Sequence, residues 1–395
     1  MSSQKKSTKL AGLSALALAA ALCAIVQPGA ANAAPAASAE DQNTSLTVSL
    51  GKEVGGAPAK RKITVPNVGE FLVLKGDFHI HTLFSDGAVM PRQRVMEAAD
   101  NGFDVIAITD HIEYHPNIGK GELKLAENNN DCNMPYKLAK PEADKQKVLL
   151  VRGAEVTKAE WHFNVLFVKD VNAIAAEVND WQAMLAVAAG QGGFVQWNHP
   201  NWIDRTPDQA PFGLKKGEPM RFFNEIEEIR AKGHLHAIEV FSNSGCMYNP
   251  IAHDWCNDHD LAVMANTDLH PSELDRFGRQ NPLRPMTLVL AKERTLASVR
   301  EAFFAKRTLG WAANRIFGRD PWAEKLFRSC VDIKKNGTGL TLRNLSDIHC
   351  VIEADGQTSE LPPQGSVDIA LTKKLTVSNW FVGAFKPLGI VLQAD

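Results

Sequence analysis

Nine side chains of types that bind metal ions lie at or just beyond the ends of successive hydrophobic, strand-like runs. Six are histidines and three are carboxylates. One His near one Asp carries little information, but strand ends converge on one face of a barrel or sheet, so repeated placement there predicts a shared site. In chain order the nine are His79, His81, Asp86, His111, Glu155, His162, His199, Asp268 and His270.

The clearest local pattern is a His-x-His pair at the end of the first run. Residues two apart in a strand point to the same side, so His79 and His81 can offer both imidazoles to one ion while Ile80 packs on the opposite face. A lone His-x-His is as often a structural pair as a metal site. Here the two-residue spacing recurs at Asp268 and His270, which favours metal binding.

The mixture of imidazoles and carboxylates indicates which ions would bind. Nitrogen and oxygen ligands together suit Zn²⁺, Mn²⁺ or iron better than Mg²⁺ or Ca²⁺. Nine ligands are too many for one ion, so we expect two or three divalent ions, with Glu155 shared between two of them. Three carboxylates against three such ions leave about +3, a charge that attracts anions and stabilises negative charge on oxygen. Phosphate esters meet that requirement.

Strand-like and helix-like stretches alternate from about residue 71, which predicts a parallel sheet with helices outside it. Seven strands suggest a barrel that is related to the eight-stranded form but smaller. The expected strands are Phe71–Ile80, Val105–Ile108, Val148–Val151, Phe163–Val168, Phe194–Trp197, Ala237–Phe241 and Leu261–Ala265. The expected helices are Arg92–Asn101, Trp181–Ala189, Glu225–Lys232 and Thr295–Lys306.

Two segments depart from this rhythm. Gly119–Ala143 is polar and asparagine-rich, and we interpret it as a surface excursion. After residue 320, short strand-like runs separated by Gly, Pro and Asp predict a small all-β module. The expected strands of the module are Cys330–Lys334, Leu340–Leu342, Ile348–Ala354, Val367–Leu371 and Leu375–Val377. The predicted domains are therefore a barrel over 66–319 and the module over 320–395.

The N-terminus has the pattern of a secretory signal peptide over residues 1–33. A lysine-containing start, the apolar run Leu10–Val26 and the small-x-small motif Ala31-Asn32-Ala33 follow in the expected order. A membrane anchor is less favoured, because the run is shorter than the roughly 20 residues that a span requires. Cys23 follows Leu22, a poor fit to a lipoprotein site. We expect a flexible leader over 34–65 and a periplasmic or secreted protein.

Charge and cysteine content narrow the function classes. Removal of residues 1–33 leaves 40 basic and 45 acidic side chains, a net charge of −5, which argues against nucleic acid as the main partner. Five cysteines remain, so at least one has no partner within the chain. Cys330 with Cys350 and Cys246 with Cys256 are pairings that an oxidising compartment would permit. The sequence does not indicate an oligomeric state.

Together these motifs resemble those of the polymerase-and-histidinol-phosphatase, or PHP, family. The carriers are Asp77 to Thr82, Ser85-Asp86-Gly87, Ile108 to His111, Glu155, His162 with Asn164, Asn198-His199-Pro200 and Asp268-x-His270. The resemblance implies a distorted seven-stranded β/α barrel with a trinuclear metal centre. One ion would take His79, His81, Glu155 and Asp268; a second Glu155, His162 and His199; a third Asp86, His111 and His270.

Within that family the chain looks like the secreted phosphodiesterases that act on small organophosphate diesters. The carriers are the block Gly76–Gly87, His111–Tyr114, Trp197–Trp202 and Arg284–Thr287. The implied reaction is attack of a metal-bridging hydroxide on phosphorus, with Asp268 or His199 moving the proton. The alternatives are a phosphomonoesterase of the histidinol-phosphate or nucleotide phosphatase kind, using the same metals, and a non-catalytic metal-binding protein.

Four further residues are candidates for contact with a small phosphate ester. His115 could protonate the leaving oxygen, although an exposed loop histidine explains it equally well. Arg276 and Arg279 follow the Asp-x-His motif and could bind a substrate oxygen, or they could be surface charges. Trp202, with Trp197, flanks His199 and could line an apolar leaving-group pocket, but core packing is the commoner fate of a tryptophan there.

Overall fold

The computed structural model describes residues 60–117, 131–157, 161–201, 220–243, 247–278 and 282–392. All of them belong to one compact unit, Pro58–Asp395. The predicted signal peptide, most of the predicted leader, Trp202 and Arg279 lie outside the described residues. Within the described part, no helix is both long and apolar enough to cross a bilayer.

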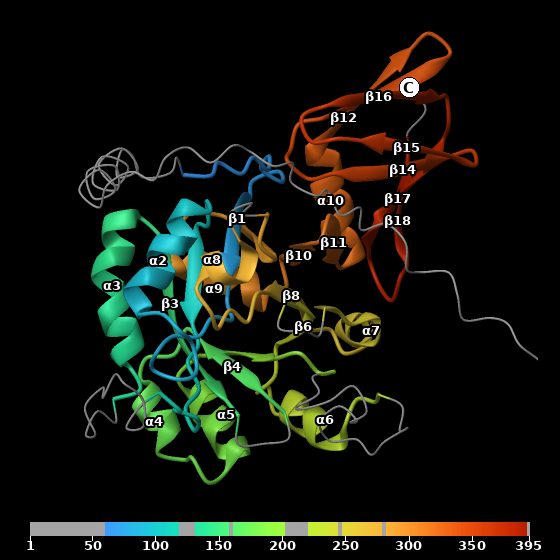
Figure 1. Ribbon diagram of the computed structural model, residues 1–395. Helices are drawn as coiled ribbons and strands as arrows, with labels where there is room; N and C mark the ends of the chain where they lie inside the picture. The colour runs from blue at the N-terminus through green and yellow to red at the C-terminus, as the bar shows by residue number, and fades with distance from the viewer. Residues whose placement is uncertain are drawn as a thin grey trace, which may run out of the picture. The chain divides into compact units, whose positions relative to one another are not determined.

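All seven strands predicted between residues 71 and 265 are present (Figure 1). Every residue of the second, fourth and fifth of them is buried, as is typical of strands covered on both faces. The strands are β1 (Leu72–Asp77), β2 (Val105–Ile108), β3 (Leu149–Val156), β4 (Phe163–Leu166), β5 (Phe194–Trp197), β6 (Ala237–Ser242) and β8 (Ala262–Asn266).

The sheet is mixed, so the prediction of a wholly parallel sheet is wrong. β1, β2 and β3 pair in parallel, and so do β5, β6 and β8. β4 runs antiparallel to both β3 and β5. The reason is the short connection, because only residues 157–162 join β3 to β4 and a parallel crossover needs about a dozen residues or more.

The last of these strands returns to the first. Ile80 and Leu269 form a parallel bridge, and the His81 amide donates to the Leu269 carbonyl at 3.0 Å. The Phe78 amide donates to Asn266 Oδ1, also at 3.0 Å. Among the described residues no continuous ladder joins β8 to β1, so the closed seven-stranded barrel stays a prediction. The contacts nevertheless bring the two strand ends that carry His-x-His and Asp-x-His side by side.

Three strands that the sequence analysis missed extend the sheet beyond β1. They are β9 (Met286–Ala291), β10 (Thr308–Ala312) and β11 (Arg315–Gly318), joined by antiparallel pairing. The β10–β11 turn residues Ala313 and Asn314 have φ angles of 48° and 58°. Two consecutive positive φ values mark a type I′ turn, which usually has Asn-Gly or Asp-Gly, so the usual hairpin signal is missing here.

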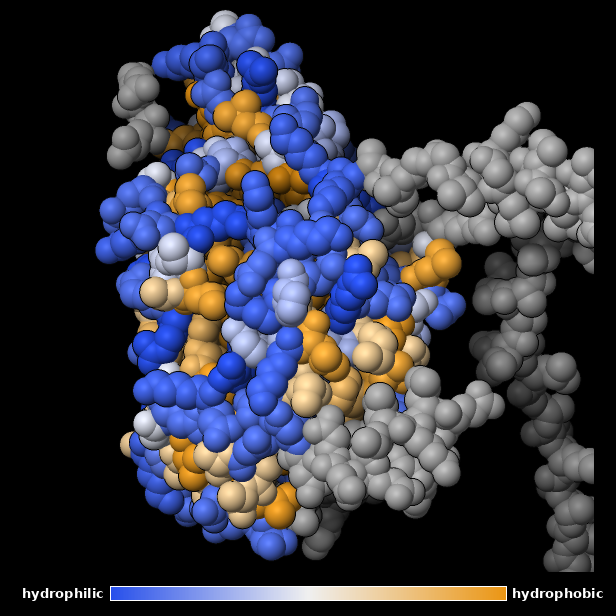
Figure 2. All heavy atoms as spheres, turned by 90° about the vertical axis from the view of Figure 1, so that its left-hand side faces the viewer, coloured by the Kyte–Doolittle hydropathy of each residue, from blue (hydrophilic) through white to orange (hydrophobic). Residues whose placement is uncertain are grey.

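The four predicted helices are present within two residues of their expected ends, as α2 (Pro91–Asp100), α5 (Trp181–Gly190), α6 (Asn224–Ala231) and α9 (Leu296–Phe304). The interpretation of Gly119–Ala143 as a surface excursion is wrong for its second half, which belongs to α3 (Met134–Gln146). Two prolines disguised α3, but Pro135 lies in the first turn, where proline is tolerated. Buried Ala139 and Ala143 anchor its inner face. Hydrophilic side chains predominate on the side of the molecule that carries α3 (Figure 2).

Four shorter or later helices were not predicted. They are α4 (Val171–Ala175), α7 (Pro250–Asp258), α8 (Glu273–Phe277) and α10 (Asp320–Cys330). Because α10 opens the C-terminal module, residues 320–395, the expectation that this module is all-β is wrong. Phe327 of α10 packs edge-on against Trp380, with ring centroids 5.7 Å apart, so the helix supplies part of the core of the module.

The rest of the C-terminal module consists of strands: the five predicted ones are present, and two more, Gln357–Leu361 and Pro387–Val391, were missed. One sheet has the order β12-β13-β16, and the other joins the main sheet through parallel pairing of β17 with β11. The strands are β12 (Val331–Asn336), β13 (Gly339–Asn344), β14 (Cys350–Ala354), β15 (Gln357–Leu361), β16 (Ser366–Ala370), β17 (Lys374–Phe381) and β18 (Pro387–Val391). Cys330 and Cys350 are free thiols, so the disulfide that the sequence permits between them is not formed. Cys246, the other half of the second permitted pair, lies outside the described residues.

A buried charge network fixes the end of β1. Arg284 Nη2 lies 2.6 Å from Asp77 Oδ2, and Thr267 donates its hydroxyl to the same oxygen at 2.6 Å. Arg284 Nη1 also lies 3.5 Å from Glu273 Oε2. Burial raises the pKa of Glu273 to about 7, and the nearby Arg284 only partly opposes this. The network ties together the ends of β1 and β8, which carry four of the nine predicted ligands.

We expect the substitution Glu273→Gln to stabilise the protein increasingly as pH rises. The unfolded carboxyl ionises near pH 4.5, whereas the folded one stays protonated to about 7. Between these values the folded state binds more protons, so the contribution of Glu273 to stability falls as pH rises. The glutamine variant does not lose this stability. Its free energy of unfolding should therefore rise by on the order of 3 kcal/mol relative to that of wild type between pH 4 and pH 8. Urea unfolding of both proteins at the two pH values measures the difference; a constant difference would contradict it.

Candidate metal centre

The first group of ligand atoms forms where β1 and β8 end. His79 and His81 are fully buried, and Ile80 between them packs into the core, as the two-residue spacing predicts. Asp268 Oδ1 lies 3.1 Å from His79 Nε2 and 3.0 Å from His81 Nε2. Glu155 Oε2 lies 3.4 Å and 3.3 Å from the same two nitrogens. Two imidazoles and two carboxylates thus surround one point.

Glu155 turns its other oxygen to a second group. Glu155 Oε1 lies 3.2 Å from His162 Nδ1 and 3.8 Å from His199 Nε2. The Asn198 amide donates to Oε1 at 2.8 Å and so fixes the carboxylate plane. Each oxygen of Glu155 therefore faces a different set of histidines, which is the arrangement needed for a carboxylate shared between two ions.

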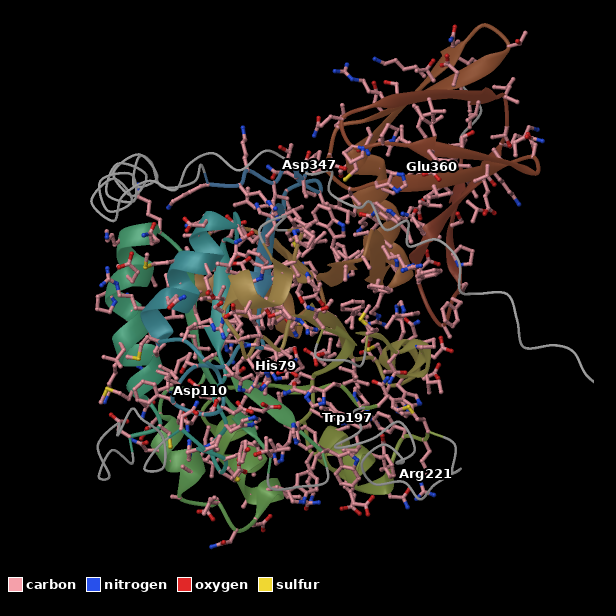
Figure 3. All side chains as sticks on the ribbon, viewed as in Figure 1. His79, Asp110, Trp197, Arg221, Asp347 and Glu360 are labelled. Atoms are coloured by element: carbon pink, nitrogen blue, oxygen red, sulfur yellow. The ribbon has the colours of Figure 1, made fainter. Side chains whose placement is uncertain are left out.

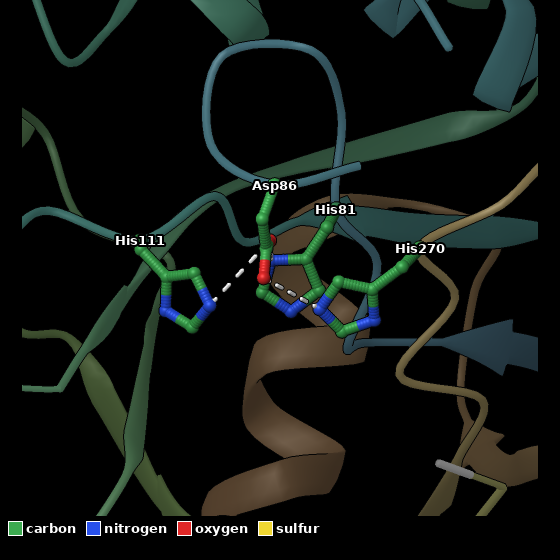
Figure 4. Close-up of side chains that lie close together, drawn as sticks. All are labelled: His81, Asp86, His111 and His270. Atoms are coloured by element: carbon green, nitrogen blue, oxygen red, sulfur yellow. Dashed lines mark ion pairs between the residues drawn. The ribbon is translucent and has the colours of Figure 1, made fainter. Parts of the chain in front are cut away.

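The third group comprises Asp86, His111 and His270, which lie around the His81 ring (Figure 4). Asp86 Oδ2 lies 3.2 Å from His270 Nε2, and Asp86 Oδ1 lies 3.6 Å from His111 Nε2. His81 Nδ1 is 3.5 Å from Asp86 Oδ1, so the His81 ring stands between the first and third groups. The candidate ligand atoms of His81, Asp86, His111 and His270 lie within 4.8 Å of one another. The same holds for His79, His81 and Glu155 in the first group and for Glu155, His162 and His199 in the second. The structure thus brings all nine predicted ligands together.

Five atoms of this cluster are buried and have no hydrogen-bond partner. They are His79 Nε2, His81 Nε2, His111 Nδ1, Glu155 Oε2 and Asp268 Oδ1. They lie close to one another, yet no N–H points at a facing oxygen, so proximity does not satisfy them. Leaving a buried polar atom unpaired costs roughly 1–3 kcal/mol. Atoms that converge in this way share one missing partner, and the chemistry of the donors fits divalent cations.

The electrostatics of the cluster divides its ligands into two kinds. Burial alone would raise the pKa of Glu155, but His111 and His79 outweigh burial and hold that pKa well below its usual range. Burial lowers the pKa of His199 to about 3 and, with His270 and His111, that of His81 to about 4. At neutral pH the Glu155 carboxylate is charged, and the His81 and His199 imidazoles keep a free lone pair. Burial alone would lower the pKa of His79, His111 and His270, but the neighbouring carboxylates outweigh burial and raise it, that of His270 to about 9, so these three rings release a proton when they bind a cation.

Neighbouring side chains hold the ligand-bearing segments. Asp110 accepts the Thr82 amide at 2.7 Å and the Ser85 hydroxyl at 2.7 Å, so it shapes the turn that presents Asp86 rather than contacting a histidine ring. Buried Arg94 of α2 donates to the carbonyl oxygens of His81 at 2.8 Å and His270 at 2.7 Å. Arg94 therefore clamps the ends of β1 and β8 together.

Two ligands have backbone conformations that side chains rarely adopt. His199 has a φ angle of 26° and Asp268 one of 52°. Positive φ costs a non-glycine residue of order 1–3 kcal/mol and tends to persist at functional sites. The strain places both ligands in the cluster, and the surrounding hydrogen bonds maintain it.

The predicted substrate contacts are less well supported than the ligands. Arg276 of α8 donates to the Asn243 carbonyl rather than into the cluster. Trp197 is fully buried and stacks on Trp255, with ring centroids 5.5 Å apart, so it packs in the core instead of lining a pocket. Figure 3 shows Trp197 and His79 at separate positions in the main body. Trp202 and Arg279 lie outside the described residues.

The contacts of His115 disfavour the predicted role as general acid, which stays a prediction. Its Nδ1 lies 2.8 Å from the Phe84 carbonyl oxygen and its Nε2 lies 2.7 Å from that of Ile112. Both nitrogens are thus occupied by the backbone. We expect His115→Gln to lower kcat by less than about tenfold, whereas loss of a general acid costs roughly 10²–10⁴-fold. Steady-state kinetics would restore the catalytic role if the loss reached that range.

The sequence analysis missed one acidic residue of the centre, Glu239. It lies within β6, is 1% exposed, and contacts both His79 and His199. A signal was present, because Glu239 is the one charged residue of the apolar run Ala237–Phe241. A carboxylate buried inside a strand requires partners of its own.

Comparison with known proteins places this geometry in a wider context. A PHP domain model matches residues 77–194. A two-domain protein from Bacteroides vulgatus ATCC 8482, described as containing a predicted PHP-like metal-dependent phosphoesterase, is 30% identical over 85% of this chain and 99% of its own, with a TM-score of 0.74. A candidate metal-dependent phosphoesterase from Bifidobacterium adolescentis ATCC 15703 is 16% identical over 58% of this chain and 96% of its own, with a TM-score of 0.34. No curated protein matches the sequence.

Proposed function

The chain belongs to the PHP domain family, and from this premise we propose that it is a metal-dependent phosphodiesterase that hydrolyses small phosphate diesters. The observation that carries the proposal is the convergence of five unpartnered ligand atoms in one buried cluster. The description of the Bacteroides protein as a metal-dependent phosphoesterase supports the reaction class. We propose two or three divalent ions, zinc, manganese or iron, held by the three ligand groups.

Ions held there would lower the pKa of a water molecule and offset the charge that builds on phosphoryl oxygens. The protein side chains fix where this happens. Glu155 and Asp268 supply the negative charge, and the histidines on three sides fix the directions of the lone pairs. Asp268 Oδ2 lies 3.8 Å from His199 Nε2, so these two residues can exchange or hold the proton released from water.

A diester suits the described surroundings better than a monoester. A monoester dianion benefits from a cationic side chain in addition to the metals. Among the described residues, Arg94, Arg276 and Arg284 lie on the segments around the cluster, and each is bound to a protein carbonyl or carboxylate. A singly charged diester needs less compensation. Phosphomonoesterase activity on the same metals is the alternative.

We propose further that β1 to β6 and β8 form the distorted seven-stranded barrel of the family, with the bridge between Ile80 and Leu269 as its seam. The basic start, apolar run and small-x-small motif within residues 1–33 support export to the periplasm or beyond. A small phosphate ester, rather than nucleic acid, is then the proposed partner.

Substrate profiling tests the choice between diester and monoester. Purified protein supplied with Mn²⁺ or Zn²⁺ should cleave bis(p-nitrophenyl) phosphate and alkyl p-nitrophenyl phosphates faster than p-nitrophenyl phosphate. A marked preference for the monoester would replace the diesterase by the phosphatase alternative. Binding of metal without cleavage of any ester would leave only the non-catalytic interpretation.

A further inference from the structure

Three hydrogen-bond donors surround the buried carboxylate of Glu239. Oε1 lies 3.1 Å from His79 Nδ1 and accepts from Asn266 Nδ2 at 3.0 Å. Oε2 accepts from the backbone N–H of His199 at 3.0 Å. The three donors come from the ends of β1, β8 and β5. One carboxylate in β6 thus joins the segments that carry His79, His199 and Asp268.

The contact with His79 determines which ring nitrogen is free. An imidazole that binds a cation through one nitrogen keeps its proton on the other, and a carboxylate oxygen can only accept, so the proton of a metal-bound His79 belongs on Nδ1. The lone pair of His79 Nε2 then faces the two carboxylates of the first group, with Asp268 Oδ1 3.1 Å away and Glu155 Oε2 3.4 Å away. His79 Nε2 is also one of the five unpartnered atoms. The position of Glu239 therefore accounts for the direction of this ligand.

The contact with His199 acts on the backbone. His199 has a φ angle of 26°, and its N–H would lose a partner if Glu239 withdrew. The hydrogen bond offsets part of the energetic cost of the strained backbone conformation. It also keeps His199 Nε2 within 3.8 Å of both Glu155 and Asp268. The same carboxylate thus supports a ligand of the first group and a ligand of the second.

We propose that Glu239 is a positioning residue that sets the tautomer of His79 and the backbone of His199, and so couples the first two metal sites. Three protein donors already bind its two oxygens, so we assign Glu239 to the support of the ligands, although its carboxylate also lies within 4.8 Å of candidate ligand atoms of His79 and His199. The inference rests on the metal centre of the proposed function. Carboxylates that orient metal-binding histidines change metal affinity by roughly 10–100-fold when they are replaced.

The test is metal affinity in two variants that fail in different ways. Glu239→Gln keeps the shape of the side chain, but its NH₂ group then faces one of the three groups that donate to Glu239. Glu239→Asp keeps the charge but withdraws the oxygens by one methylene. Competition with a chromophoric chelator should show Zn²⁺ binding weakened by roughly 10–100-fold in both variants. Glu142→Gln, which alters a buried carboxylate of α3 outside the cluster, is the matched control and should bind like wild type.

A second readout separates positioning from general support of the fold. In zinc-loaded protein labelled with ¹⁵N-histidine, the Nδ1 proton of His79 should give a downfield resonance that is lost in His79→Gln. The resonance should move upfield in Glu239→Gln, or in Glu239→Asp if only that variant folds. Unchanged affinity and an unchanged resonance in a folded variant would overturn the inference while the metal centre stands. Absence of metal binding in wild type would overturn both.

Discussion

Replacement of Glu155 by glutamine is expected to remove two of the bound ions and nearly all activity. Each Glu155 oxygen faces a different ligand group, with Oε2 3.4 Å from His79 Nε2 and Oε1 3.2 Å from His162 Nδ1. An amide nitrogen cannot bind a cation, so the substitution breaks the bridge. We expect kcat/KM to fall roughly 10³-fold or more, because a metal contributes several kcal/mol of charge stabilisation and about 1.4 kcal/mol is tenfold.

Metal content and activity measured on the same preparation check this prediction. Elemental analysis should show that Glu155→Gln keeps at most the ion of the third group, which has ligands of its own in Asp86, His111 and His270. Glu142→Gln, treated in the same way, should keep the wild-type content and rate. A Glu155→Gln protein with undiminished metal content and rate would show that the carboxylate is not shared.

Asp268→Asn is expected to abolish turnover while it leaves the fold intact. Asp268 Oδ1 lies 3.1 Å from His79 Nε2 and 3.0 Å from His81 Nε2. Burial alone would raise the pKa of Asp268, but His79 and His270 hold that pKa well below its usual range. The amide keeps the shape, loses the charge and cannot take a proton. Loss of general acid–base function costs roughly 10²–10⁴-fold in rate.

Saturating metal distinguishes the two roles of Asp268. If the residue moves the proton from water, kcat of Asp268→Asn should stay low when Mn²⁺ or Zn²⁺ is in excess, and circular dichroism should match that of wild type. Asp104→Asn, which alters a surface pair with Lys75, is the control and should leave kcat unchanged. Full recovery of kcat with excess metal would reduce Asp268 to a ligand.

The candidate site was largely predictable because ligands at strand ends leave a local signature. His79 and His81 show it through two-residue spacing, and Asp268 and His270 repeat it. Each follows an apolar run whose burial is a property of the run itself. The order of the strands then brings the ends together, and no detailed side-chain geometry is needed to foresee the cluster.

The residues that hold the ligands were harder to foresee, because their role depends on contacts between distant segments. Arg94 resembles an ordinary charged helix residue until α2 packs against the carbonyls of His81 and His270. Glu239 is one charge in a strand, and its partners are 27 to 160 residues away. His115 has the right spacing from His111, yet the loop turns its nitrogens to carbonyls.

The same contrast holds for the fold: elements that one local run defines were predicted, and elements that depend on other segments were not. Strands with continuous burial, such as β2 and β5, were placed within a residue, since one apolar run defines each. The direction of β4 depends on the length of its connection to β3, and α3 depends on tertiary burial of Ala139 and Ala143 that overrides two prolines. The hydrophobic periodicity of the segment itself predicts neither the direction of β4 nor the presence of α3.

The most direct test of the central claim is the metal dependence of phosphodiester cleavage. Purified protein is assayed with bis(p-nitrophenyl) phosphate before treatment with a chelator, after it, and after return of Mn²⁺ or Zn²⁺. The account predicts cleavage that is lost with the metal and restored by two or more ions per chain. Cleavage that survives complete removal of metal, or restored metal without cleavage of any phosphate ester, would contradict it.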